Sequence, residues 1–567
     1  MDHPTPRPGG HILADQLKEL GADAVFCVPG ESFLDLLDGL HNHQDTIQTI
    51  VCRQEGAAAN MADAYAKMTG KPGICAVTRG PGATNASNGI HTAFQDSSPM
   101  IVLIGQVGRS MVDREAFQEM DYRRVFGEMA KWVAEINDPA RIPEYLSRAW
   151  KTALSGRPGP VVLALPEDML KEMATVPDIR PTPVPMPSSS AADIAELEAR
   201  LAKAEKPLLL VGGPGWSAEI AKEAQAFVER TGLPVATSFR CQDYIDNDHP
   251  QYAGVLGIAP LPNLRKRIAD EVDLLIVLGS RLGEMTTQGY SLINIPDPQM
   301  DFVHIHPGAE ELGHVYNPTQ SIQSSAAAFF EAAKALPDGD GKTRWADWVK
   351  TQRADYDAFL EPTEVPGDLN MGKVVAHITA TMPKDTVITN GAGNYTVWPH
   401  RFHRHRAYRT QLAPTSGSMG YGVPAAIAAK VISPDQPVIS FSGDGCFMMC
   451  AQEMATARLY DLDVIYLVVN NGMLGTIRMH QERHHPDRTI ATDLFNPDFV
   501  AYAASFGISG ERVTSTEEFP AALGRAQSAK GGYLIELVVD AQALTPTQTL
   551  AEANAQGHAT LTKKTKA

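Results

Sequence analysis

Short runs of apolar residues recur along the chain in three groups of four, separated by segments long enough to form helices. The runs are rich in β-branched residues and are continuous rather than alternating, which is typical of parallel strands buried on both faces. They occupy residues 24–30, 73–79, 99–105 and 160–166, then 208–213, 234–238, 273–279 and 302–306, and finally 386–391, 437–443, 464–470 and 533–540. The pattern predicts an α/β protein with three doubly wound parallel-sheet domains.

Changes in composition mark the domain boundaries. A Pro/Ser-rich stretch begins at Pro177, and a second polar stretch runs from Leu336 to Asp368 with a helix inside it. Such stretches are typical of linkers. We therefore expect domains at residues 1–175, 190–335 and 365–545.

Charge and cysteine content narrow the classes of partner. The 567-residue chain has a formal net charge of −17 and no basic run beyond the terminal Lys-Lys-Thr-Lys, so nucleic acid and anionic membranes are not expected partners. The chain has neither an apolar run of about 18 residues nor a secretory signal pattern, so a cytoplasmic location is expected. The six cysteines form no CxxC pair and are expected to be buried, reduced thiols.

The run Gly443-Asp444-Gly445 is the strongest chemical signal. It follows one apolar strand, and Asn470-Asn471 closes the next. Carboxylate and amide oxygens suit Mg²⁺, and glycines allow a diphosphate to approach the backbone. Because ligands bind at the carboxyl ends of parallel strands, the two motifs together predict a metal–diphosphate site. The alternative is that they are two unrelated polar turns.

A second motif surrounds Glu55. This residue follows a strand and lies in the first turn of an Ala-rich helix that Gly70 ends. An acid at this place is also favoured by the helix dipole alone, so an ordinary helix-terminal role is the alternative.

Together these motifs resemble the thiamine diphosphate (ThDP) enzymes. Glu55, Ala57, Asp63, Tyr65 and Ala66 have the spacing of the family's E-x-A-x(5)-D-x-Y-A signature. The resemblance implies that Glu55 hydrogen-bonds N1′ of the cofactor's pyrimidine. ThDP then reacts through a carbanion at C2, which its own 4′-imino group generates. The implied role of Glu55 is a proton relay.

Within that family the chain resembles acetolactate (acetohydroxyacid) synthases and pyruvate oxidases. The matching segments are VPGESF at 28–33, TRGPGATNASNGI at 78–90, REAFQEMD at 114–121 and TSGSMGYGVPAAIAAK at 415–430. The resemblance implies a pyrimidine-binding first domain, a Rossmann-like central domain and a diphosphate-binding last domain. It also implies that Phe117 and Gln118 line the reaction pocket, and that Met419 holds the cofactor bent. Implied metal ligands are Asp444, Asn471 and the carbonyl of Met473. Implied cofactor contacts are Pro29, Gly30, Glu55, Gly393, Asn394, Tyr395, Gly417, Met419, Gly443, Asp444, Gly445, Cys446, Asn471, Met473, Leu474 and Gly475.

Several residues depart from the family pattern. Asn394-Tyr395 replaces a Gln-His pair, and Glu167 replaces the lysine of a Pro-Lys-Asp segment. His480 aligns with a tryptophan that selects the second ketoacid in many acetolactate synthases, which puts a preference for larger ketoacids in doubt. Glu31 replaces the second glycine of a Pro-Gly-Gly segment; it either projects a charge toward the substrate or is a solvated loop acid.

The central domain leaves its cofactor open. Its GGPGWS turn at 212–217 is weak support for NAD because serine replaces the last glycine of GxGxxG. Acetolactate synthases bind FAD in this domain. The GSRLGE segment makes Arg281 a candidate FAD contact, but residues 257–260 lack the family's GMHG.

The leading functional hypothesis is ThDP- and Mg²⁺-dependent carboligation of the acetolactate synthase type. Pyruvate or a related 2-ketoacid loses CO₂, and the acyl carbanion is transferred to a second carbonyl. The alternatives are another ThDP-dependent decarboxylase or lyase, a cofactor-binding protein without activity, and a nicotinamide dehydrogenase. The resemblance also implies a transferase of branched-chain amino acid biosynthesis, assembled as a homodimer or homotetramer, with a small regulatory subunit as a further partner.

Overall fold

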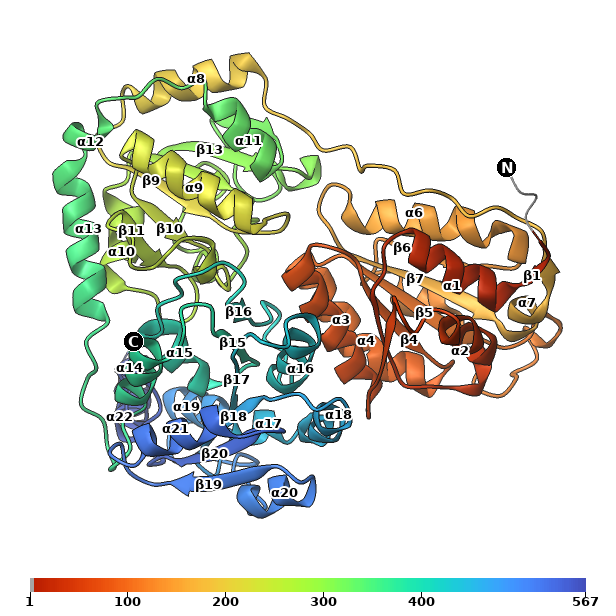
Figure 1. The fold of residues 1–567 in the computed structure, drawn as a ribbon. Coiled ribbons are helices and arrows are strands. Elements are labelled where there is room, and N and C mark those ends of the chain that lie inside the picture. The colour runs from red at the N-terminus through yellow and green to blue at the C-terminus, as the bar shows by residue number, and fades with distance from the viewer. Residues whose placement is uncertain (1–4, 567) are drawn as a thin grey trace. The chain divides into compact units, whose positions relative to one another are not determined.

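The computed structural model describes residues 5–566 and contains three parallel six-stranded sheets with helices on both faces (Figure 1). The chain divides into two compact units, Met1–Met186 and Pro187–Ala567, and the second unit holds two of the sheets. The predicted fold class is therefore confirmed. All six cysteines are buried and none of them forms a disulfide bond, as expected. Within the described residues, none of the helices is both long and apolar enough to span a membrane.

The sheet of the first unit has the order β3-β2-β4-β5-β7-β6. Its four inner strands are buried along their whole length, whereas the two edge strands are partly exposed. A short antiparallel pair, β1 with β8, lies apart from this sheet. The strands are β1 (Arg7–Pro8), β2 (Ala24–Cys27), β3 (Gln48–Val51), β4 (Gly73–Val77), β5 (Met100–Gln106), β6 (Trp132–Glu135), β7 (Pro160–Pro166) and β8 (Met173–Ala174).

Helices cover both faces of this sheet because each face is apolar. Their bounds are α1 (Gly9–Glu19), η1 (Glu31–Phe33), α2 (Leu34–His41), α3 (Glu55–Thr69), α4 (Pro81–Asp96), η2 (Arg109–Met111), α5 (Tyr122–Phe126), η3 (Pro139–Arg141), α6 (Ile142–Leu154) and α7 (Glu167–Lys171). Helices α1, α2 and α6 share one hydrophobic core with one face of the sheet. Helices α3 and α4 pack against each other.

The central sheet has the order β11-β10-β9-β12-β13-β14. Its strands are β9 (Pro207–Val211), β10 (Val235–Thr237), β11 (Tyr252–Val255), β12 (Leu274–Leu278), β13 (Asp301–His306) and β14 (Gln320–Gln323). Its helices are α8 (Ala191–Leu201), α9 (Ala218–Thr231), η4 (Gln242–Tyr244), α10 (Pro262–Asp270), η5 (Ala309–Glu311), α11 (Ala326–Ala333), α12 (Gly341–Arg344) and α13 (Ala346–Phe359).

The C-terminal sheet has the order β16-β15-β17-β18-β20-β19. Its strands are β15 (Val387–Asn390), β16 (Gln411–Leu412), β17 (Val438–Gly443), β18 (Ile465–Asn470), β19 (Ser509–Val513) and β20 (Tyr533–Val538). Its helices are α14 (Met371–Thr381), η6 (Asn394–Thr396), α15 (Val397–Phe402), α16 (Gly422–Ile432), α17 (Asp444–Phe447), η7 (Ala451–Glu453), α18 (Met454–Leu459), α19 (Gly475–His484), α20 (Phe499–Ser505), α21 (Phe519–Ser528) and α22 (Leu550–Lys566).

The three sheets have two topologies. Numbered along the chain within each sheet, the first and last sheets both have the order 2-1-3-4-6-5, whereas the central sheet has the Rossmann order 3-2-1-4-5-6. In each sheet the order reverses beside the first strand. Ligands of such sheets bind outside the carboxyl ends of the strands at this reversal. The fold therefore singles out the ends of β2 and β4, of β9 and β12, and of β15 and β17.

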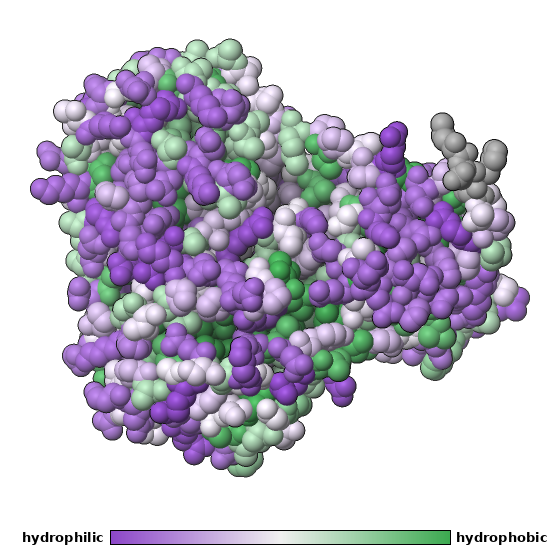
Figure 2. Space-filling view, in the orientation of Figure 1, coloured by the Kyte–Doolittle hydropathy of each residue, from purple (hydrophilic) through white to green (hydrophobic). Residues whose placement is uncertain are grey.

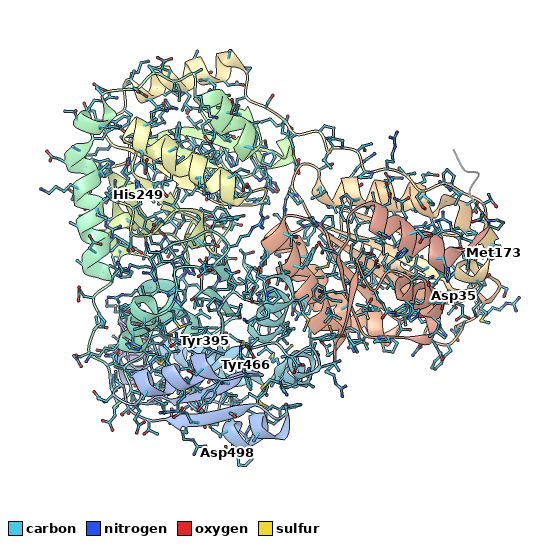
Figure 3. All side chains as sticks on the ribbon, viewed as in Figure 1. Asp35, Met173, His249, Tyr395, Tyr466 and Asp498 are labelled. Carbon is cyan, nitrogen blue, oxygen red and sulfur yellow. The ribbon has the colours of Figure 1, made fainter. Side chains whose placement is uncertain are left out.

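Polarity on the surface follows the usual division. Hydrophilic residues cover most of the visible face (Figure 2), and apolar residues come to the surface in the C-terminal region, where Met449 and Leu459 are exposed. Side chains fill the space between sheets and helices (Figure 3), and Tyr395 and Tyr466 both lie in the C-terminal region. Tyr466 is fully buried in β18.

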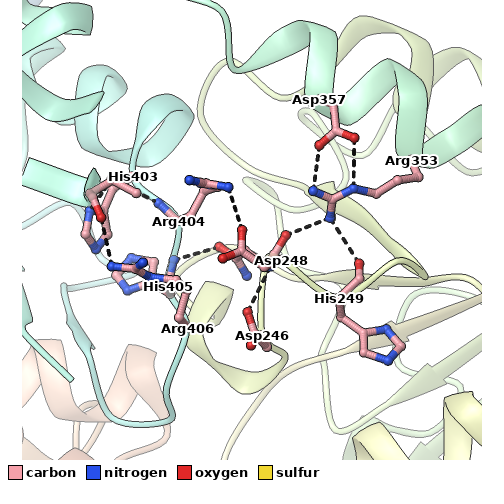
Figure 4. Close-up of polar contacts among 11 residues, drawn as sticks. Asp246, Asp248, His249, Arg353, Asp357, His403, Arg404, His405 and Arg406 are labelled. Atoms are coloured by element: carbon pink, nitrogen blue, oxygen red, sulfur yellow. Dashed lines mark hydrogen bonds and ion pairs between the residues drawn. The ribbon is translucent and has the colours of Figure 1, made fainter. Parts of the chain in front are cut away.

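Within the second unit, polar contacts join the central sheet's loops to the C-terminal region (Figure 4). Asn247 and His405 exchange two hydrogen bonds of 2.9 Å, one through the Asn247 side chain. Arg404 forms an ion pair of 2.6 Å with Asp248, and Arg353 donates to the Asn247 carbonyl. Through these contacts, backbone amides and carbonyls of the two segments obtain the hydrogen-bond partners that buried backbone groups require.

Candidate functional site

Charged and polar side chains of the first unit gather at the carboxyl edge of its sheet. Glu31 follows β2, Glu55 follows β3, Arg79 follows β4 and Glu167 follows β7. Because all six strands of the sheet are parallel, their carboxyl ends lie at one edge. This edge therefore carries three carboxylates and one guanidinium on separate loops.

Glu55 begins α3, as the sequence predicts, and Gly70 ends the helix in a left-handed conformation. The side chain of Gln54 caps the helix by accepting from the Ala57 amide, so Glu55 is not used as the cap. Its Oε2 atom accepts a hydrogen bond of 2.9 Å from Asn85 Nδ2. Its Oε1 atom faces Gly82, where an added Cβ would lie 3.3 Å away. One carboxylate oxygen is thus held, and the other faces a residue without a side chain.

Gln118 and Phe117 lie on the loop after β5. Gln118 has a φ of +66°, and a Cβ at Gly80 would come within 2.8 Å of Gln118 Cβ, so this close approach requires glycine. Gly80 also donates its amide to the hydroxyl of Tyr122. Phe117 is 73% exposed. The structure thus places the predicted pocket residues Phe117 and Gln118 beside the loop that leads to α4.

Pro29, Gly30 and Glu31 form the loop after β2. A Cβ at Gly30 would lie 2.5 Å from the Cβ of Thr78, so this loop contacts the end of β4 directly. Glu31 has a side chain that is 70% exposed, and its Oε1 lies 3.5 Å from Arg79 Nη2. Glu31 is therefore an exposed loop acid and, at the same time, one partner of a buried cation.

Asp444 occupies the corresponding edge of the C-terminal sheet, directly after β17. Its residue is only 3% exposed. Oδ1 accepts from the Gly445 amide at 2.9 Å, and Oδ2 accepts from the Gly472 amide at 3.0 Å and from Asn496 Nδ2 at 2.8 Å. Burial raises the pKa of the Asp444 carboxyl above its usual value, and the hydrogen bonds that it accepts oppose this rise.

The pairing of β17 with β18 aligns Gly443 with Val469, and so it brings Asn470 and Asn471 to the same edge of the sheet as Asp444. Asn470 Oδ1 accepts from the Gly472 amide, and its Nδ2 donates to Glu536 at 2.7 Å. Asn471 Oδ1 accepts from the Met473 amide at 3.2 Å. The two asparagines therefore differ: Asn470 is tied to the neighbouring strand, whereas Asn471 shapes the turn that carries Met473.

Glycines allow neighbouring side chains to pack closely around this turn. A Cβ at Gly445 would lie 2.9 Å from Leu474 Cδ2 and 3.9 Å from the terminal methyl of Met419, so these residues lie together at the strand ends. A Cβ at Gly475 would lie 2.9 Å from Asn471 Nδ2. Gly417 has a φ of +70° and open space around it.

Tyr395 and Cys446 form a buried pair at the reversal between β15 and β17. The Tyr395 hydroxyl donates to Cys446 Sγ at 3.1 Å and accepts from the Gly391 amide at 3.0 Å. Gly393, with a φ of +141°, precedes this helical turn. Asn394 instead faces α19 and accepts from Thr476 Oγ1 at 2.9 Å. In this structure Tyr395 thus supports the loop through its hydroxyl.

His480 lies on the exposed side of α19. Its ring stacks parallel to that of His484, with centroids 6.2 Å apart. Partial burial, followed by the nearby charges of Arg483 and His484, lowers the pKa of His480 below its usual value. The side of α19 toward Asn394 carries Thr476 and Met479 instead.

The oxygen and nitrogen donors at these strand ends can be compared with the ligands that the resemblance implies. A buried carboxylate, an amide oxygen and a backbone carbonyl are the hard oxygens that Mg²⁺ takes, so Asp444, Asn471 and Met473 fit such an ion. At Gly443, Gly445 and Gly475 the side chains of Tyr395, Leu474 and Asn471 fill the space that a Cβ would need, so these positions require glycine. Glycine backbone of this kind is what diphosphate-binding turns use.

The central sheet does not offer the same fit to a dinucleotide. At its reversal, a Cβ at Gly213 would lie 1.7 Å from the Gly279 carbonyl oxygen, so the turns after β9 and β12 touch. Trp216 Nε1 donates to the Gly212 carbonyl at 3.0 Å, and the Tyr244 hydroxyl donates to the Gly213 carbonyl at 2.7 Å. Two aromatic side chains thus close over this turn.

The beginning of α9 also disfavours a phosphate. Ser217 caps the helix by accepting from the Ile220 amide, and Glu219 lies in the first turn with the pKa of its carboxyl lowered by hydrogen bonds. A carboxylate there repels a phosphate group from the place that dinucleotide folds use for it. The residues of this turn do not fit the diphosphate of FAD or NAD. Arg281 follows β12 at the same edge.

Four further residues join the predicted ones at the two edges. Asn85 and Arg79 lie inside the matched 78–90 segment. The sequence does not specify their contacts: Asn85 donates to Glu55, and Arg79 forms an ion pair with Glu31. Asn496 reaches Asp444 from a loop 52 residues away. Glu536 binds Asn470, a contact that the adjacency of buried β18 and β20 explains.

Comparison with known proteins gives a consistent result for all three regions. Residues 7–125, 194–333 and 391–537 match the N-terminal TPP binding domain, the central domain and the C-terminal TPP binding domain of thiamine pyrophosphate enzymes. The chain is 32% identical over 524 residues to the acetolactate synthase large subunit of Parasynechococcus marenigrum. The aligned region covers 90% of this chain and 84% of that protein.

Two further relatives show the same extent of similarity. The acetolactate synthase large subunit of Corynebacterium glutamicum is 32% identical over 542 residues, covering 92% of this chain and 85% of that protein. The large subunit of acetolactate synthase isozyme 2 of Escherichia coli is 29% identical over 535 residues, covering 94% and 95%.

Proposed function

We propose a function from the premise that this chain belongs to the thiamine pyrophosphate (thiamine diphosphate) enzymes and, among them, to the acetolactate synthase large-subunit group. The protein is a ThDP- and Mg²⁺-dependent carboligase. It decarboxylates pyruvate or a related 2-ketoacid and transfers the resulting acyl group to the carbonyl of a second molecule. The observation that carries this proposal is the placement of Asp444 and Asn471 after the adjacent strands β17 and β18.

The C-terminal site would hold the charged end of the cofactor. Asp444, Asn471 and the carbonyl of Met473 would bind Mg²⁺, and the ion would keep the buried Asp444 carboxyl ionised. The backbone at Gly443, Gly445 and Cys446 would contact the diphosphate, with Met419 beside it.

The first unit would hold the pyrimidine end. When bound, ThDP supplies the carbon nucleophile and accepts the electrons released by decarboxylation. Asn85 holds Glu55 Oε2, so Oε1 is the oxygen that would exchange a proton with the pyrimidine. Gln118 and Phe117 would line the substrate side of this site.

Assembly completes the proposal. In the families that this chain resembles, the first domain of one subunit faces the last domain of another, so Glu55 and Asp444 of one active site would come from different chains. We propose a homodimer or homotetramer, with a small regulatory subunit as a further partner. The exposed Met449 and Leu459 of the C-terminal region and the exposed Phe117 supply apolar surface for such contacts. We place the enzyme in the cytoplasm and in branched-chain amino acid biosynthesis.

A second candidate function is another ThDP-dependent decarboxylase or lyase. Glu31 and His480 favour it, because both place polar groups where acetolactate synthases have a glycine and an apolar wall. Neither candidate reaction includes a redox step, so neither requires a flavin, and FAD in the central domain stays a prediction.

Product analysis tests the proposal. The purified protein is supplied with ThDP, Mg²⁺ and pyruvate, and both CO₂ and carbon products are measured. Acetolactate formed in a one-to-one ratio with CO₂ supports the leading function. Acetaldehyde as the main product supports the second candidate instead. Omission of Mg²⁺ followed by chelation serves as the control and is expected to abolish both products.

A further inference from the structure

Arg79 stands at the reversal in strand order of the first sheet, where β2 lies beside β4. It lies two residues after the end of β4, and its side chain is only 8% exposed. A buried guanidinium is costly unless it is paired, so its partners show how it is used. The proposed function so far gives Arg79 no task.

Three oxygen atoms surround the guanidinium. Nε donates to the Phe117 carbonyl at 3.2 Å, and Nη1 donates to Glu167 Oε2 at 3.3 Å. Nη2 lies 3.5 Å from Glu31 Oε1 as an ion pair. Glu167 is 26% exposed and Glu31 is 70% exposed. The contact with Glu31 is therefore the longest of the three and the most open to solvent.

Such a contact is easily exchanged. Glu31 is open to solvent, so water competes for its carboxylate, and holding the side chain in one rotamer costs free energy. The Phe117 carbonyl and Glu167 would hold the guanidinium in place while Nη2 changes partners. A carboxylate from a ligand matches the planar N–H donors of arginine as well as the Glu31 carboxylate does.

The neighbours of Arg79 place it beside the reaction site. Gly80 contacts Gln118, and Gly82, on the next turn, faces Glu55 Oε1. Arg79 also binds the carbonyl of Phe117, the residue before Gln118. Arg79 is thus joined by a backbone carbonyl to the loop of Phe117 and Gln118, and the glycines that follow it along the chain approach Gln118 and Glu55.

The decarboxylation step determines which of the two substrates Arg79 can usefully bind. The carboxylate of the donor 2-ketoacid leaves as CO₂, and a guanidinium bound to it would stabilise the ground state and oppose that step. The carboxylate of an acceptor 2-ketoacid is retained in the product. A fixed cation is useful only for the acceptor.

We propose that Arg79 binds the carboxylate of the acceptor 2-ketoacid, which displaces Glu31 from Nη2. This inference rests on the proposed carboligase function. Arg79 is then the residue that distinguishes a 2-ketoacid acceptor from a neutral aldehyde, and Glu31 is an internal competitor that occupies the site when no acceptor is bound.

The test uses the holoenzyme with one donor, pyruvate, and two acceptors, a second 2-ketoacid and a neutral aldehyde. Arg79→Met is expected to raise the KM for the 2-ketoacid acceptor by about ten- to a hundredfold, the value of a charge-assisted hydrogen bond. The KM for the aldehyde and the release of CO₂ from the donor should change little. Arg79→Lys, which keeps the charge without the fork, should fall between. Arg109→Met is the matched control, since Arg109 is a paired, partly exposed cation on the same unit.

Glu31→Gln keeps the proposal testable if Arg79→Met does not fold. It removes the competing charge and should lower the KM for the 2-ketoacid acceptor while leaving the aldehyde unaffected. Equal losses for both acceptors on replacing Arg79, or no change in either variant, would overturn the assignment. If the unmodified enzyme releases no CO₂ from any 2-ketoacid, the proposed function itself fails, which is a different result.

Discussion

The first and last sheets have the same strand order but carry opposite charges at equivalent strand ends. The third strand of the first sheet, β4, leads to Arg79, and the third strand of the last sheet, β17, leads to Asp444. Both residues lie at the reversal in strand order, and both are less than 10% exposed. One fold thus provides the same location twice, and the side chain at that location decides which ligand it suits.

The two ends also differ in how their charged groups are held. Asp444 is fixed by two backbone amides and Asn496, and so its oxygens stay in place. Arg79 and Glu55 are held by side chains or a loop carbonyl, and each keeps one side toward an exposed or glycine-lined space. The first arrangement suits a fixed cation, and the second suits groups that exchange a proton or a partner.

The largest effect is expected from Asp444→Ala. This change removes the only carboxylate among the three proposed metal ligands and leaves Mg²⁺ and the diphosphate with less charge compensation. ThDP affinity in the presence of Mg²⁺ should fall more than about 100-fold, beyond the loss typical of residues that only support a ligand. Calorimetry measures this affinity. Asp385→Ala, at an exposed acid before β15, is the control and should bind normally. Unchanged affinity in Asp444→Ala would show that this edge binds no metal–diphosphate.

A loss of rate without a loss of binding is expected from Glu55→Gln. The amide has nearly the same volume and can still contact Asn85, but it cannot exchange a proton with the pyrimidine. Turnover should fall by about 10²- to 10⁴-fold, the contribution of general acid–base catalysis, while ThDP affinity and thermal unfolding stay near those of the unmodified protein. Steady-state kinetics and circular dichroism of the bound cofactor measure both. The surface change Glu19→Gln provides the comparison, and near-normal turnover in Glu55→Gln would remove Glu55 from the mechanism.

The sequence predicts the inner strands of all three sheets and misses the edges. The four inner strands of each sheet are nearly continuous apolar runs because helices cover both of their faces. The edge strands β3, β14 and β19 are partly exposed and carry Gln, Ser and Glu, so no apolar run marks them. Edge strand β16 has only two residues. Such strands are defined by pairing with a neighbour, which a single sequence does not encode locally.

The site residues divide in the same way. Asp444 and Asn471 are predictable because each directly follows an apolar strand in a short motif, and Glu55 because it opens the Ala-rich helix α3 with a recognisable spacing of residues. Asn496 is not, because its contact with Asp444 depends on how a distant loop returns to the sheet. The pairing of Arg79 with Glu31 likewise depends on β2 and β4 being neighbours. Residues that act through tertiary contacts therefore emerge only from the structure.

Mixing the two inactive variants tests whether the edges work as partners across chains. After subunit exchange, half of the dimers contain one Glu55→Gln chain and one Asp444→Ala chain, and each of these has one intact site. Activity should return to about one quarter of the unmodified value. Light scattering measures the oligomer in parallel. An active monomer, or a mixture that stays inactive despite proven exchange, would place Glu55 and Asp444 of one site on the same chain.

The smallest effect is expected at His480, which lies on α19 of the last sheet. If it replaces the specificity tryptophan, the acceptor site lacks an apolar wall, and selectivity for 2-ketobutyrate over pyruvate should be weak, since one methylene is worth only about 1–3 kcal/mol even in a fitted pocket. His480→Trp should raise this selectivity several-fold in a competition assay with both ketoacids. His484→Trp, four residues along the same helix, is the matched control. Because His480 is exposed and stacked on His484 within this unit, the prediction requires that another chain complete the acceptor site. A strong preference for 2-ketobutyrate in the unmodified enzyme, or an equal response to Trp at both places, would put His480 outside that site and leave acceptor selection to the first unit.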